Sequence, residues 1–257
     1  AYQLLRRMAA NARSEQYLLL AELGFAKIAI ERGNLPAAAG MLDRILEDTR
    51  SDQRGSVRSK ALLDRARVAS QMGDYESAAL LGHEALVCTT DAMDRERILL
   101  DIGNTLTQLG MWDEARDAFL VAGATAQEAA VRWMAQINLM EIAYLDGNEL
   151  MFEHYQRAVS ELALPPYIET VYHETRAHGL CVFGRTDEGA RAFQNMLNIA
   201  ERHELNDFAR KAERALENMA AVTSPVTRIK RRERKEEPTQ LSAVADSLSK
   251  MRVLAGL

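Results

Sequence analysis

The sequence predicts an all-α fold, a right-handed α-solenoid built from about five helix-turn-helix repeats. Five glycines divide the chain at nearly equal intervals, first of 40 residues and then three times of 37: Gly33, Gly73, Gly110, Gly147 and Gly184. A fixed period of this length is typical of stacked supersecondary units. Alanine, leucine and methionine are abundant, whereas aromatic residues make up only 6% of the chain. This composition favours helices over sheets.

Each glycine stands where one apolar, helix-patterned run ends and the next begins. Glycine adopts the left-handed conformation that closes a helix without steric cost. Pro36 suits an early helical position, where its missing N–H is not needed. Four residues are expected to cap the following helices through their side chains: Asn34, Asp74, Asn148 and Thr186. Every repeat is therefore predicted to be a helix, a tight turn and a second helix.

Small residues recur at fixed distances from these glycines. Seven residues before them are Ala26, Ala66, Gly103, Met140 and Ala177, and five residues after them are Ala38, Ala78, Ala115, Phe152 and Gly189. Two antiparallel helices approach closely only where side chains are small, so these positions are expected at the helix crossings. Phe119 and Phe193, nine residues after their glycines, are expected to fill the core.

This pattern resembles the tetratricopeptide repeat family over roughly residues 14–203. The third unit matches it best, through Gly103, Gly110, Trp112, Ala115, Phe119 and Ala122, and the second through Ala66, Gly73, Asp74, Tyr75, Ala78 and Ala85. The fourth unit departs, since Met140 and Phe152 stand where the family has small residues. The resemblance implies stacked helix pairs whose first helices line a concave groove that holds an extended peptide or a helix.

The helix pairs are predicted at 14–32 with 35–49, 57–72 with 75–89, 92–109 with 112–124, 126–146 with 149–163, and 166–183 with 187–203. A short helical stretch over 1–13 and a partly polar helix over 205–221 are expected to cap the two ends. Residues 1–221 would thus form the repeat domain. A basic, polar linker is predicted over 222–240 and an amphipathic helix over 241–257.

The resemblance also implies which side chains line the groove, by their distance from each turn glycine. The expected groove residues are Lys27, Lys60, Arg67, Arg97, Asn104, Gln108, Met134, Ile137, Glu141, Tyr144, Glu174 and His178. The first part of this row is cationic and polar, whereas the later part is apolar with acidic positions. A protein or peptide partner with an acidic segment would be attracted to the first part.

The C-terminal segment is too short to be a stable helix alone in water, so it needs a surface to lie on. Its expected docking residues are Leu241, Val244, Leu248, Met251 and Leu254. The preceding run over 228–235 carries six cations, but glutamates are interspersed and no aromatic residue is present for base stacking. We therefore expect no nucleic-acid partner for this chain, and the tail can dock on its own body or on another copy, giving a homo-oligomer.

Catalytic and cofactor sites are not expected. Glu174, His178 and Cys181 share a helix face, but no fourth ligand accompanies them, so we predict no metal site. No glycine-flanked serine, P-loop or dinucleotide-binding motif is present. Cys88 and Cys181 lack metal-binding spacing and are expected to be buried thiols in a reducing, cytoplasmic compartment. No apolar run is long enough to span a bilayer, and no signal peptide opens the chain.

The sequence thus predicts a non-catalytic protein–protein interaction module without cofactors. Two alternatives remain open from the sequence. Because Ala1 stands where an initiator methionine would be, the chain is expected to belong to a longer protein, such as a bacterial transcription regulator or ATPase switch with this domain as its regulatory or sensor arm. The second alternative is a structural protein that assembles through its tail.

Overall fold

The protein folds entirely into helices, turns and loops over the residues that its computed structural model describes: 3–4, 7, 15–50, 55–220 and 239–257. Five helix pairs follow one another: α2 (Glu15–Glu31) with α3 (Leu35–Asp48), α4 (Ser56–Gln71) with α5 (Tyr75–Cys88), α6 (Ala92–Gln108) with α7 (Trp112–Thr125), α8 (Ala129–Leu145) with α9 (Glu149–Ser160), and α10 (Pro166–Val182) with α11 (Thr186–Arg202). Two single helices complete the chain, α12 (Asn206–Ala220) and α13 (Thr239–Leu254). The predicted all-α class and its repeated helix pairs are confirmed. Most of the predicted linker and of the predicted N-terminal cap lie outside the described residues, and α13 begins at Thr239, two residues before the predicted start of the tail helix.

The five glycines close the first helix of each pair in the left-handed conformation. Their φ angles lie between 71° and 80°. After each glycine, the next backbone N–H donates to a carbonyl five residues earlier, as in Asn34 to Ala29 at 2.9 Å and Asp74 to Ala69 at 2.9 Å. This bond satisfies a carbonyl that the helix end would leave without a partner. The turn is therefore repeated because the same local chemistry is repeated.

Three of the four predicted caps form as expected, and the fourth was wrong. The side chains of Asn34, Asp74 and Asn148 each accept a bond from the backbone N–H three residues on. Thr186 is already the first residue of α11, and Arg185 takes the capping position without a side-chain capping bond. The guanidinium of Arg185 instead donates to the Glu188 carboxylate at 2.7 and 2.9 Å.

Large side chains at the helix crossings lie against glycines of a neighbouring helix. A methyl group on Gly103 would come within 2.3 Å of the Phe119 ring. In the fourth unit, where the family pattern has a small residue, Phe152 is fully buried and its ring lies against Gly179 of α10. A methyl group on Gly179 would approach that ring to 2.1 Å. The large residue of one unit is thus accommodated by a glycine in the next.

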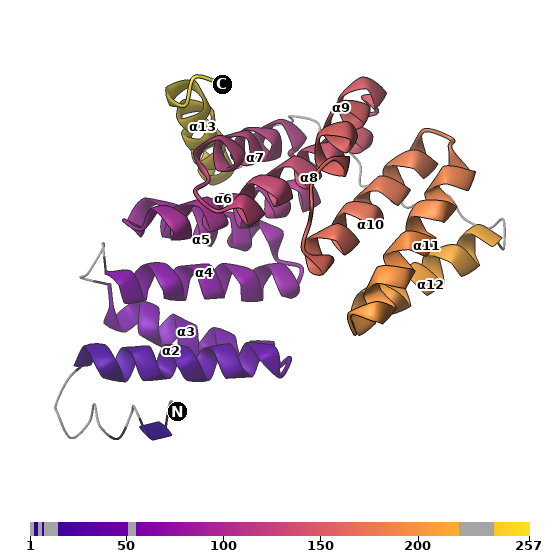
Figure 1. Ribbon diagram of the computed structural model, residues 1–257. Coiled ribbons are helices and arrows are strands. Elements are labelled where there is room, and N and C mark those ends of the chain that lie inside the picture. Colours follow the sequence, from indigo (N-terminus) through magenta and orange to yellow (C-terminus); the bar gives the residue numbers. More distant parts are fainter. Residues whose placement is uncertain (1–2, 5–6, 8–14, 51–54, 221–238) are drawn as a thin grey trace.

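The first helices of successive pairs form one continuous layer. Helix α2 contacts α4, α4 contacts α6, α6 contacts α8, and α8 contacts α10. Figure 1 shows that the array bends, so that α2–α5 and α10–α12 form two arms on either side of α6–α9. We call the layer of first helices the inner layer. Helix α13 packs instead on the second helices α5 and α7.

Candidate functional site

The predicted groove residues occupy an equivalent position on each first helix. Lys27, Arg67, Asn104, Glu141 and His178 all stand six residues before the turn glycine of their unit. Their helices contact one another in order. These side chains therefore form a single row across the inner layer.

Three side chains of this row form an ion pair or a hydrogen bond with the next unit. The partner in each case is the residue nine positions before that unit's turn glycine. The pairs are Lys27 with Asp64 at 3.6 Å, Arg67 with Asp101 at 3.0 Å, and Asn104 accepting from Asn138 at 2.9 Å. We call this series the inner ladder. Because the same two positions meet at each step, the ladder follows directly from the repeat.

The cations predicted to attract an acidic partner are paired within the chain. Lys27 and Arg67 belong to the inner ladder, and Arg97 donates to both carboxylate oxygens of Glu128 at 2.7 and 3.0 Å. Sequence reasoning missed these acidic partners, although the recurrence of aspartate nine residues before two of the glycines is a usable signal. The positive charge expected over the first units is thus largely balanced.

Burial raises the pKa of both ladder aspartates, and the neighbouring cations oppose this effect. For Asp64, the loss of hydration is the largest cause of the raised pKa, while Lys27 and Arg67 act in the opposite direction. The pKa of Asp101 is raised by burial and lowered again by Arg67. The cations therefore help to keep these two carboxylates charged inside the layer.

The ladder changes character between α8 and α10. Burial raises the pKa of Glu141 from 4.5 to about 7, and the negative charge of Glu174 on α10 raises it further. A hydrogen bond with Tyr144 acts in the opposite direction. The cation at this end, Lys211 of α12, binds Glu174 at 3.1 Å. Glu141 therefore keeps its proton to a higher pH than an ordinary glutamate.

His178 is enclosed by its own unit. Its ring meets the ring of Phe193 edge-on, with the centroids 5.1 Å apart. Burial is the main cause that lowers the pKa of His178, so the imidazole is neutral at pH 7. Within the described part of the chain, no three His, Cys, Asp or Glu side chains are close enough together to hold a metal ion.

The other predicted groove residues divide between surface and core. Lys60, Arg97 and Gln108 are exposed, and Tyr144 is half-buried. The prediction for Ile137 was wrong, because this side chain is fully buried in the core shared by α8 and α10. Helix α10 packs directly on α8, so an apolar residue on that face is covered by the next unit.

The overall helical fold is shared with a solved protein. The structure is similar to the crystal structure of a tetratricopeptide repeat protein from Parabacteroides merdae ATCC 43184, with a TM-score of 0.57 and 14% sequence identity. The similarity covers 98% of this chain and 91% of that chain. The chain has a tetratricopeptide-repeat fold. No protein-family model matches the sequence, and a comparison with curated proteins gives no match either.

The tail helix of this repeat fold docks on the chain's own body, away from the inner layer. Leu241, Val244 and Leu248 are buried in the core shared with α5 and α7, and Met251 packs against it. Arg252 completes the contact through an ion pair with Asp117 of α7 at 2.9 Å.

The docking prediction was wrong for Leu254. This side chain is 87% exposed. It is the last residue of α13 and lies beyond the part of the helix that contacts α7 and α5. The docking face therefore ends near Met251.

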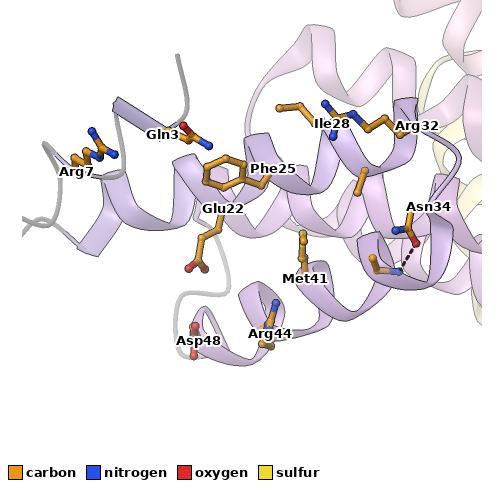
Figure 2. A pocket seen from close by; sticks show the side chains of 12 residues that line it. Gln3, Arg7, Glu22, Phe25, Ile28, Arg32, Asn34, Met41, Arg44 and Asp48 are labelled. Atoms are coloured by element: carbon orange, nitrogen blue, oxygen red, sulfur yellow. Dashed lines mark hydrogen bonds between the residues drawn. The ribbon is translucent and has the colours of Figure 1, made fainter.

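Two of the hollows in the described part of the chain lie at the first units. One, of about 200 Å³, lies between α4 and α6 and contains the ladder pair Arg67 and Asp101. The other, of about 1220 Å³, lies at the N-terminal end, where apolar Phe25, Ile28 and Met41 are surrounded by charged side chains (Figure 2). Sequence reasoning did not single out the N-terminal hollow.

The two cysteines of the repeat fold are both free. Cys88 is buried, as expected, whereas Cys181 is only half-buried. Burial raises the pKa of both thiols. Among the helices described, none is long and apolar enough to cross a membrane.

Proposed function

We propose that the protein is a non-catalytic protein–protein interaction module whose inner layer binds a peptide or helix of a partner. The observation that carries the proposal is the row of equivalent side chains, which crosses five successive first helices. A partner segment lying along this row meets a regular series of polar groups. The tetratricopeptide-repeat fold supports a protein-interaction role, and no catalytic or cofactor motif was found in the sequence.

The exposed side chains of the row define the contacts that a partner would make. Lys60 shares a face of α4 with Asp64, one helical turn later, and with Arg67, two turns later. The Lys60 side chain is exposed, and no ion pair to it is recorded among the described residues. Asn104 and Gln108 share the next face on α6. We propose that an acidic group of the partner meets Lys60, since Lys27, Arg67 and Arg97 are already paired, and that the amides bind its backbone.

This function can be tested by capturing partners from cell extract with variants of the chain that each differ at one surface residue. Lys60→Glu reverses a charge on the inner layer, and Arg157→Glu makes the same change on an exposed position of α9. We expect Lys60→Glu to weaken binding of the captured partner by about tenfold or more, mainly through slower association. Arg157→Glu should leave it unchanged. Equal binding by both variants and the unaltered chain would refute a role for the inner layer.

Self-assembly through the tail is the alternative function that the packing makes testable. Leu241, Val244 and Leu248 are buried against α5 and α7 of the same chain. Assembly through these residues would therefore require α13 to exchange between copies. Light scattering of the chain with and without residues 239–257 separates the two functions. An interaction module keeps the same number of chains per particle after the deletion, whereas a protein that assembles through its tail loses its oligomer.

We also propose a cytoplasmic location. The support is chemical, because both cysteines are free and neither pairs with the other. Free thiols persist most readily in a reducing compartment.

A further inference from the structure

A polar crevice lies between α9 and α10. It has a volume of about 320 Å³ and is lined from both helices and from the loop that joins them. The crevice exists because the backbone of α10 approaches α8 and α11 closely and α9 at only a few positions. The loop ends in Pro165, which takes an extended conformation before α10 begins. We call this hollow the α9–α10 crevice.

Buried polar atoms without a partner are concentrated in this crevice. Eight buried side-chain nitrogen or oxygen atoms lack a hydrogen-bond partner among the described residues, and three of them belong to crevice residues: Gln156 Oε1, His173 Nδ1 and Arg176 Nε. Buried polar atoms in proteins are nearly always hydrogen-bonded, to protein, water or ligand. Three such atoms on residues that line a single crevice indicate a place where another molecule, water or ligand, supplies the missing bonds.

The charged side chains of the crevice indicate which charged group a bound molecule must have. Burial and the neighbouring Arg176 lower the pKa of His173 to about 4, so its imidazole is neutral at pH 7. Arg176 is the cation of the crevice, and no ion pair to it is recorded within the described part of the chain. The nearby carboxylate of Glu188 is already held by Arg185, at 2.7 and 2.9 Å. Arg176 is half-buried with its Nε atom buried, and a guanidinium gains charge-assisted hydrogen bonds when an anion binds it.

Other lining groups accept hydrogen bonds or supply apolar contacts. The amide oxygen Gln156 Oε1 accepts a hydrogen bond, and Glu169, seven residues before Arg176 on the same face of α10, adds a carboxylate. Val159, Leu162 and Leu164 supply apolar contacts. The crevice thus combines a guanidinium that can bind an anion, oxygen atoms that can accept from an N–H donor, and an apolar wall.

We propose that the α9–α10 crevice binds a small amino-carboxylate, a molecule of amino-acid type whose carboxylate meets Arg176 and whose amino group meets Gln156 and Glu169. A simple carboxylate satisfies Arg176 but leaves the amide oxygen without a donor. A simple amine has no anion for the guanidinium. An amino acid satisfies both, and its side chain lies on the apolar wall. The volume is at the lower end of small-ligand pockets, which suits a molecule of this size.

The test is binding of each common L-amino acid to the full chain, measured by calorimetry and by amide chemical shifts of α9 and α10. The first probe is the amino acid that binds best. The second, matched probe is the carboxylate of the same structure without the amino group. We expect Arg176→Gln to weaken both probes by about tenfold or more, since a hydrogen bond to a charged group is lost. Gln156→Leu should weaken the amino acid and leave the simple carboxylate unchanged. Arg157→Gln, an exposed change on the same helix, is the control and should affect neither.

Two results would overturn the proposal. One is the absence of binding by any common amino acid at concentrations up to about 10 mM, which would make this a hydrated crevice only. The other is binding that survives both Arg176→Gln and Gln156→Leu, which would place the ligand elsewhere. Circular dichroism of each variant separates lost binding from lost folding, and Gln156→Leu remains informative if Arg176→Gln does not fold.

Discussion

Glu141 should make the stability of the protein fall as the pH rises from about 4.5 to about 7. In the folded chain the pKa of this carboxyl is raised from 4.5 to about 7, chiefly by burial and then by the charge of Glu174. Below pH 4.5 the group is protonated in both the folded and the unfolded chain, so it has no effect. Above pH 7 it is charged in both, and the folded state bears the cost of the buried charge. The loss of stability therefore develops between these two values.

The size of this effect follows from the shift in pKa. One pKa unit corresponds to about 1.4 kcal/mol, so a rise from 4.5 to about 7 sets an upper limit of about 3 kcal/mol. Solvent at the half-buried side chain reduces the cost, and we expect about 1–3 kcal/mol. Glu141→Gln removes the charge while keeping an oxygen that accepts from Tyr144. The variant should differ least from the unaltered protein at pH 5 and exceed its stability most at pH 8.

Urea unfolding at pH 5, 6, 7 and 8 measures this difference as a shift in the midpoint. Glu217→Gln, at an exposed position on α12, serves as the matched control and should leave the pH profile unchanged. If Glu141→Gln and the unaltered protein lose stability in parallel from pH 5 to pH 8, the buried charge is not the cause. The assignment of a neutral carboxyl to the inner layer would then be wrong.

Two further predictions concern packing. Gly103→Ala should destabilise the protein by about 1–3 kcal/mol, because its methyl group would lie 2.3 Å from the Phe119 ring. Gly40→Ala places its methyl group where no atom lies within 4 Å, so this variant should raise the melting temperature. Equal melting temperatures for the two variants would contradict this packing. Leu248→Asp should release α13 and speed amide exchange in that helix, because it places a charge in a fully buried site. Leu254→Asp should not, and protection of α13 that survives Leu248→Asp would show that the docked position is held by other contacts.

Much of the fold could be predicted from local signals. Gly33, Gly73 and their counterparts fix the turns, because the left-handed conformation they need is accessible to glycine and rarely to other residues. Asn34 and Asp74 cap the next helices with their own side chains. Thr186 failed as a cap because the helix began one residue earlier than expected, and the choice between two neighbouring residues depends on small energies.

The candidate site was only partly predictable. The positions Lys60 and Asn104, which the resemblance to the repeat family implied, are exposed on their helices. The burial of Ile137 does not follow from that resemblance, because it depends on how closely α10 approaches α8. The partners of Arg67 and Arg97 likewise come from a different unit, and the sequence pattern alone did not identify them.

The sequence by itself determined the repeated helix pairs, because turn glycines, capping side chains and small crossing residues act over a few neighbouring positions. Only the tertiary structure decided how the units use their surfaces: which cations are paired across the inner layer, where α13 lies, and where a crevice opens between α9 and α10. These features depend on contacts between residues more than 30 positions apart or on the angle between whole helices. Such contacts arise when units pack, and the pattern of one repeat does not contain them.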